Sequence, residues 1–89
     1  MSDNDFFDAV DAFLNLANEL NRKLDTSEVS TALMYATARY NAFNFFATDG
    51  DIDNEFPTFK GLCEQYQTLL QKNMVEMRKQ FEETPPSGS

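Results

Sequence analysis

Apolar residues recur every three or four positions along three segments of the chain, which is the spacing of one face of an α-helix. In the first segment these residues are Phe6, Val10, Phe13, Ala17, Leu20 and Leu24. In the second they are Val29, Leu33, Ala36, Tyr40, Phe43 and Ala47. In the third they are Phe59, Leu62, Cys63, Tyr66, Leu69, Leu70, Met74, Met77 and Phe81. The spacing predicts helices over 4–24, 27–47 and 55–83.

The connections between these segments are short, and no segment shows the alternation typical of a strand. Short connections favour antiparallel neighbours, so the pattern predicts an all-α, antiparallel three-helix bundle. We expect a single domain over 1–83, because a chain of 89 residues has room for one core. The stretch 84–89 is rich in Pro, Gly and Ser and is expected to be a flexible tail.

Helix ends are also marked in the sequence. Asp25 stands three residues before Glu28, the spacing of a capping box at the start of the second helix. Gly50 follows that helix and suits the left-handed backbone conformation common just past a helix end. Pro57 is expected in the first turn of the third helix, where a missing N–H is tolerated.

The second helix is apolar around almost its whole circumference, with Arg39 as the charge in its middle. Such a helix needs cover on several sides, and two other helices supply only part of it. We therefore expect a homodimer that buries part of this helix. The candidate oligomer surface is formed by three aromatic residues whose joint exposure would be unusual in a monomer: Phe43, Phe45 and Phe46.

Fifteen acidic against seven basic residues give a net charge of −8, which limits the classes of partner. A strongly acidic chain repels nucleic-acid phosphates and anionic membranes, so basic or neutral proteins are better partners. No membrane span and no signal peptide are predicted. The lone Cys63 gives no disulfide framework and fits the reducing cytoplasm; on the apolar face of the third helix it is expected to be buried.

The acidic residues concentrate in two runs that an antiparallel bundle would bring to one pole. This acidic pole comprises Asp3, Asp5, Asp8, Asp11, Asp49, Asp51, Asp53 and Glu55. Carboxylates there would stabilise helix N-termini, or would contact a basic partner. The run from Asp49 to Asp53 resembles the start of a calcium loop, but Asn54 and Lys60 stand where such a loop needs Gly and Glu, so calcium binding tighter than millimolar is not expected.

Arg39 is the charged residue that fits its surroundings least, because its neighbours one turn away are Ala and aromatic residues. Its guanidinium is expected to need a partner in partly desolvated surroundings. Across the hairpin that partner would be Asp11, with Asp8 next to it and Glu64 as an alternative. Arg39 could instead hold an anion of a ligand or partner. The polar residues grouped with it as a candidate site are Asp11, Tyr35 and Asn41.

The sequence contains few of the residues and motifs that catalysis requires. The chain has no His, no phosphate-binding glycine loop and no complete set of metal ligands, so neither a cofactor nor a metal is predicted. Proton transfer would have to rely on carboxylates, Tyr or Lys. We therefore do not expect an enzyme.

Three blocks of the sequence resemble a known family: FFDAVDAFLNLANEL, EVSTALMYATARYNAFNFFA and EQYQTLLQKNM. They are similar to the successive blocks of the bacterial domain-of-unknown-function family 3144. The resemblance covers most of 6–75 and implies a small, mainly cytoplasmic helical protein with no established activity. It places Asp11, Arg39 and Asn41 at positions of the family's motifs.

The function expected from these observations is that of a non-enzymatic interaction or regulatory module that self-associates through its second helix. The alternative is an acidic decoy that occupies the nucleic-acid channel of a basic protein. A decoy would need carboxylates that follow one face, whereas here they cluster in two runs.

Overall fold

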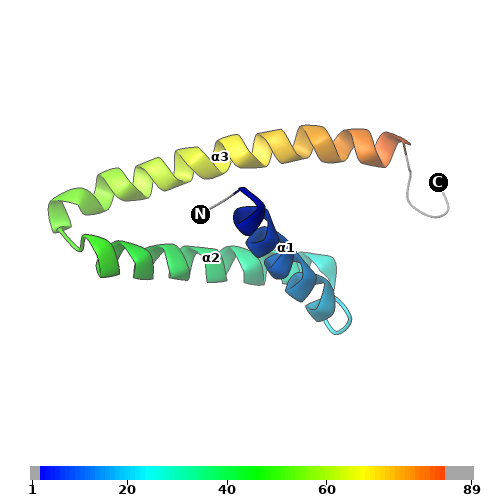
Figure 1. Ribbon diagram of the computed structural model, residues 1–89, viewed down its shortest axis with the longest axis horizontal. Coiled ribbons are helices and arrows are strands. Elements are labelled where there is room, and N and C mark those ends of the chain that lie inside the picture. Colours follow the sequence, from blue (N-terminus) through cyan, green and yellow to red (C-terminus); the bar gives the residue numbers. More distant parts are fainter. Residues whose placement is uncertain (1–2, 84–89) are drawn as a thin grey trace. The chain divides into compact units, whose positions relative to one another are not determined.

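The computed structural model describes residues 3–83, which form three helices (Figure 1). They are α1 (Asp3–Leu20), α2 (Thr26–Thr48) and α3 (Ile52–Glu83), and no strand occurs in these residues. The predicted all-α, three-helix fold is confirmed. The tail predicted at 84–89 lies outside the described residues.

The chain divides into two compact units, Met1–Asn44 and Phe45–Ser89, with the boundary inside α2. The first unit holds α1 and most of α2, and the second holds the last residues of α2 and all of α3. The single domain expected over 1–83 stays a prediction. No helix in the described part of the chain is long and apolar enough to cross a membrane.

α1 ends at Leu20, four residues before the end that the apolar spacing predicts. Here the backbone tightens: the Arg22 N–H donates to the Glu19 carbonyl at 3.2 Å and the Lys23 N–H to the Leu20 carbonyl at 3.0 Å. These bonds span three residues, as in the 3₁₀ turns that often finish a helix. Leu24 continues the apolar spacing beyond the turn, and therefore the spacing alone places the helix end too late.

The start of α2 is fixed by the predicted capping box, which the structure confirms. The Glu28 N–H donates to Asp25 Oδ1 at 2.8 Å, and the Asp25 N–H donates to Glu28 Oε1 at 3.3 Å. Each side chain thus satisfies a backbone donor that the helix itself cannot pair.

The end of α2 is closed by Gly50, as predicted. Gly50 has a φ of 73°, in the left-handed region that residues with a Cβ rarely adopt. Its N–H donates to the Phe45 carbonyl at 3.0 Å, and the Asp49 N–H donates to the same carbonyl at 2.9 Å. One carbonyl of the last turn therefore accepts both bonds that end the helix.

α3 begins at Ile52, three residues earlier than predicted, because the acidic connector itself caps it. Asp51 Oδ1 accepts from the Asp53 N–H at 2.9 Å, and Asp49 Oδ1 accepts from the Asp51 N–H at 3.1 Å. The earlier start moves Pro57 from the expected first turn into the second turn. There Pro57 has no N–H to donate to the Asp53 carbonyl four residues back, at the cost of one helical bond.

Few apolar side chains are buried within the chain. Among the described residues Val29 and Phe45, each 8% exposed, are the buried hydrophobic side chains, while large apolar residues along all three helices are exposed. In the described residues of the second unit, 45–83, only the last residues of α2 accompany α3, so no second long helix occurs there to cover the α3 apolar face. The fold therefore leaves much apolar surface for another molecule to cover.

A Gly→Ala change should have opposite effects on the free energy of unfolding at the two described glycines, Gly50 and Gly61. Gly50→Ala forces a Cβ into a left-handed conformation and should lower the free energy of unfolding by about 1 kcal/mol. Gly61→Ala, in the interior of α3 with no heavy atom within 4 Å of an added Cβ, should raise it by about 0.5–1 kcal/mol. Urea unfolding of both variants measures the difference; equal shifts of the same sign would contradict the structure at Gly50.

Candidate functional site

The candidate site lies on an exposed face of α2 that the apolar spacing of the sequence does not indicate. Its residues step by 4, 3 and 4 positions, so they form one line along the helix, here called the Tyr35 stripe. The stripe consists of Glu28, Ala32, Tyr35 and Arg39, all of which are exposed. Because the line mixes charged, small and aromatic side chains, it does not stand out as an apolar pattern.

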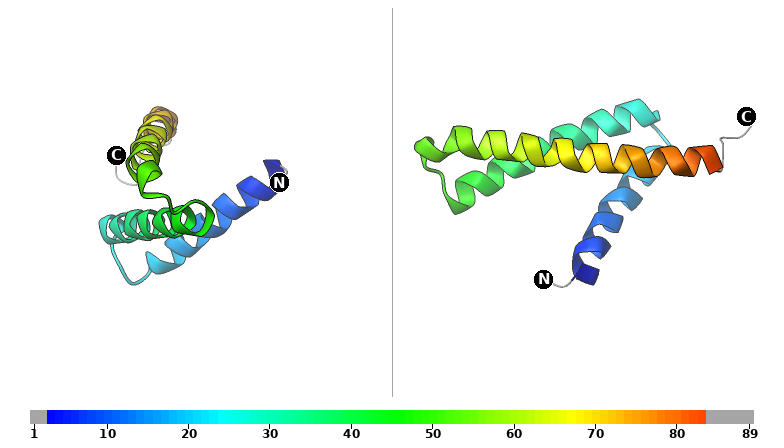
Figure 2. Two further views of the ribbon diagram at one scale, coloured as in Figure 1. Left: turned by 90° about the vertical axis from the view of Figure 1, so that its left-hand side faces the viewer. Right: turned by 90° about the horizontal axis from the view of Figure 1, so that it is seen from above.

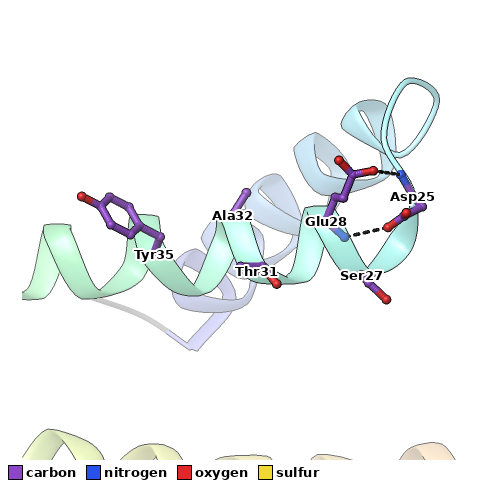
Figure 3. Close-up of a pocket in the computed structure, with 6 residues that line it drawn as sticks. All are labelled: Asp25, Ser27, Glu28, Thr31, Ala32 and Tyr35. Atoms are coloured by element: carbon purple, nitrogen blue, oxygen red, sulfur yellow. Dashed lines mark hydrogen bonds between the residues drawn. The ribbon is translucent and has the colours of Figure 1, made fainter.

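The N-terminal end of the Tyr35 stripe borders a shallow hollow that is open to solvent (Figure 3). Six residues line it: Asp25, Ser27, Glu28, Thr31, Ala32 and Tyr35. Figure 3 shows Tyr35, Ala32 and Glu28 along the same side of the helix, with the small Ala32 between the two larger side chains. The hollow therefore offers space beside a ring, which suits a side chain that protrudes from a partner.

The capping box limits the chemistry of this hollow. Asp25 and Glu28 each use one carboxylate oxygen to accept a hydrogen bond from a backbone N–H. Their remaining oxygens can accept from a cation, whereas no nucleophile with an adjacent base lines the hollow. The arrangement is suited to recognising a charged or aromatic group.

Arg39 is exposed, which corrects the expectation that its guanidinium is partly desolvated. Within residues 3–83 the ion pairs are Arg22–Glu19 at 3.5 Å and Lys60–Glu64 at 3.6 Å, so Arg39 does not pair with Asp11, and the alternative partner Glu64 pairs with Lys60. The reason is visible in Figure 2, where α1 leaves α2 obliquely. Positions equally far from the turn therefore diverge, and the expected pairing across the hairpin does not form.

The remaining polar candidates of this group separate in the structure. Tyr35 is 68% exposed, and Arg39, which lies one turn further along the Tyr35 stripe, is also exposed. Asn41 is half-buried on another side of α2, and Asp11 is exposed on α1. Of the four candidates, the structure brings Tyr35 and Arg39 onto one line.

The three phenylalanines of the candidate oligomer surface are not equivalent. Phe43 is 63% exposed and Phe46 is 62% exposed, whereas Phe45 is buried. The Phe43 ring lies 5.8 Å from the Tyr40 ring, and the Phe46 ring meets the Phe45 ring edge to face at 5.1 Å. Two of the three rings are thus available to another molecule.

The acidic connector is organised by hydrogen bonds to its own backbone and side chains. Besides the two capping bonds of Asp49 and Asp51, Asp49 Oδ2 accepts from the Asn54 side-chain amide at 3.0 Å. No group of three or more His, Cys, Asp or Glu side chains that could hold a metal ion occurs among the described residues. The acids of α1 at 3, 5, 8 and 11 are exposed, and their position at one pole with the connector stays a prediction.

Cys63 is exposed, contrary to the expectation of a buried thiol. The apolar spacing correctly places it on a helix. Spacing predicts which face is apolar, but burial requires a partner for that face, and residues 45–83 of the second unit contain no other long helix.

A comparison with protein families matches residues 6–77 of the chain to the family described as "Protein of unknown function (DUF3144)". The match covers most of the 89 residues. The chain belongs to this family. For this DUF3144 member the resemblance seen in the sequence is confirmed, and all residues of the Tyr35 stripe lie within the matched range. No curated protein and no solved structure matches the chain.

Because Arg39 and Asp11 do not pair in the structure, their energetic coupling should be close to zero. Arg39→Ala, Asp11→Ala and the double variant should give free energies of unfolding that add within about 0.5 kcal/mol. Denaturant unfolding at one fixed protein concentration provides the three values. A coupling above about 1 kcal/mol would show that the two side chains meet in solution.

The connector should bind calcium no tighter than millimolar. Asp49 and Asp51 already accept backbone hydrogen bonds, and Lys60 puts a cation where a calcium loop needs its last carboxylate. Calorimetric titration with calcium chloride is expected to show no saturable heat at micromolar concentration. Stoichiometric micromolar binding would contradict this prediction.

Proposed function

We propose that this DUF3144 protein is a non-enzymatic helical interaction module that self-associates through α2. The observation that carries the proposal is the exposed α2 face, where Tyr35, Phe43 and Phe46 are each more than 60% exposed. Exposed apolar surface of this kind marks interaction sites in folded proteins. Burial of such rings removes apolar area from water and is worth about 25 cal/mol per Å².

Charge supports α2 as the contact between copies. α2 carries one acid, Glu28, and one base, Arg39, and is therefore neutral, whereas α1 carries five acids and no base. Two copies that each have a net charge of −8 repel one another least where their neutral surfaces meet.

Helix length also favours association between copies. α3 has 32 residues and α2 has 23, which correspond to about 48 Å and about 34 Å of helix. Exposed apolar residues continue along α3 as far as Phe81. No other helix among the described residues matches the length of that apolar face, so a second molecule is the source of cover that we propose.

The proposal also includes a regulatory role and a location in the cytoplasm. The location is supported by the lone thiol, which fits a reducing compartment. The acidic-decoy alternative has less support. A decoy needs free carboxylates in a row, whereas Asp49 and Asp51 each accept a hydrogen bond from a backbone N–H at the start of α3.

The proposal predicts a homodimer mass at micromolar concentration by light scattering or sedimentation. Tyr35→Ser should weaken the dimer at least about tenfold, because it removes a ring that is 68% exposed from the α2 contact surface. Phe7→Ser is the control: Phe7 is 60% exposed on α1, so this change removes a ring of similar exposure from a different helix. A monomer mass for the parent chain, or equal effects of both variants, would overturn the proposal.

A further inference from the structure

The Tyr35 stripe has an order of side chains that is complementary to itself when reversed. Its midpoint lies between Ala32 and Tyr35. Glu28 and Arg39 lie at equal distances from that midpoint, about 8 Å along the helix axis on either side. Read in the opposite direction, the stripe therefore places an acid opposite a base and a small residue opposite a large one.

We propose that a second copy of the chain docks antiparallel on the Tyr35 stripe, so that Glu28 of each copy pairs with Arg39 of the other. The two-fold axis passes through the midpoint of the stripe. The inference rests on the proposed self-association and adds its register, its direction and the residues that set them. By symmetry, one kind of ion pair occurs twice in such an interface.

Both charged groups are free to make this contact. Within residues 3–44, the described part of its own unit, the structure pairs Arg39 with no acid, and Arg39 is exposed. Glu28 uses one oxygen for the capping bond to Asp25 at 3.3 Å, which leaves its other oxygen for an incoming donor. Within one helix the two side chains are about 16 Å apart, too far to neutralise each other, so both charges remain available to a second molecule.

Shape supports the same register. Opposite each Tyr35 the antiparallel arrangement places Ala32 of the second copy, which has the smallest of the side chains that line the hollow. The ring of Tyr35 thus enters the space beside Ala32 that Figure 3 shows open. Small residues opposite large ones are what allow two helices to approach closely.

A parallel arrangement of the same faces lacks this complementarity. It would set Arg39 against Arg39 and Glu28 against Glu28, two like-charge contacts that oppose association. It would also set Tyr35 against Tyr35 and leave Ala32 facing Ala32. The side chains of the stripe therefore select the antiparallel direction.

Charge reversal tests the register. Arg39→Glu alone creates two acid–acid contacts in the antiparallel dimer, and Glu28→Arg alone creates two base–base contacts. Each variant should weaken its own dimer by about tenfold or more in sedimentation. An equimolar mixture of the two variants should recover association as a heterodimer, because both of its contacts are then acid to base.

Two controls separate the contact from side effects. Glu28→Gln keeps an oxygen for the capping bond but removes the charge, and should weaken the dimer by only a few-fold. Arg22→Glu makes the same charge change as Arg39→Glu at an exposed position outside the stripe, and should leave dimer affinity within about twofold. Circular dichroism reports whether each variant keeps its helices.

A distance measurement does not depend on the charge variants. Spin labels at Thr26→Cys, in a Cys63→Ser background, should lie about 22 Å apart along the axis in the antiparallel dimer but only about 8–10 Å apart in a parallel one. If the parent dimer shows the short distance, or if the mixture of the two charge variants does not recover association, the register is overturned while self-association stands. A monomeric parent chain overturns both.

Discussion

Apolar surface without internal cover is the constraint on which this structure depends. Three helices carry apolar faces, yet Val29 and Phe45 are the hydrophobic side chains that the described residues bury. Burial of side chains, more than helix propensity, gives most helices in proteins their stability. A chain that leaves this much apolar surface exposed gains stability from whatever molecule covers it, and association is then coupled to folding.

Against that weak burial, hydrogen bonds at the helix ends define the elements. The reciprocal bonds of Asp25 and Glu28 begin α2, the shared Phe45 carbonyl ends it, and Asp51 begins α3. Much of the acidity of the chain is therefore used locally, beside helix N-termini where negative charge is favourable. The absence of carboxylates from most of α2 leaves that helix as the neutral surface of an otherwise acidic protein.

The environment of Arg39 in the structure differs from the one that its sequence neighbours predict. In the sequence it lies among Ala and aromatic residues, and these neighbours indicate a buried charge that needs an internal partner. In the structure those neighbours are themselves exposed, so the guanidinium remains solvated and unpaired in the described part of the chain. The proposed contact between copies uses its position on the same line as Glu28 and Tyr35.

The sequence by itself determined the three helices, the capping box and Gly50, because these features depend on residues within a few positions of one another. It placed the end of α1 and the start of α3 less well. Leu24 continues the helical spacing although α1 ends at Leu20, and the capping bonds of Asp49 and Asp51 let α3 begin earlier than the spacing predicts. Only the tertiary structure decided that Arg39 and Asp11 do not meet and that Cys63 and most apolar rings are exposed. Those outcomes depend on the angle at which α1 leaves α2 and on how much surface each unit can cover, and neither quantity is encoded in local spacing.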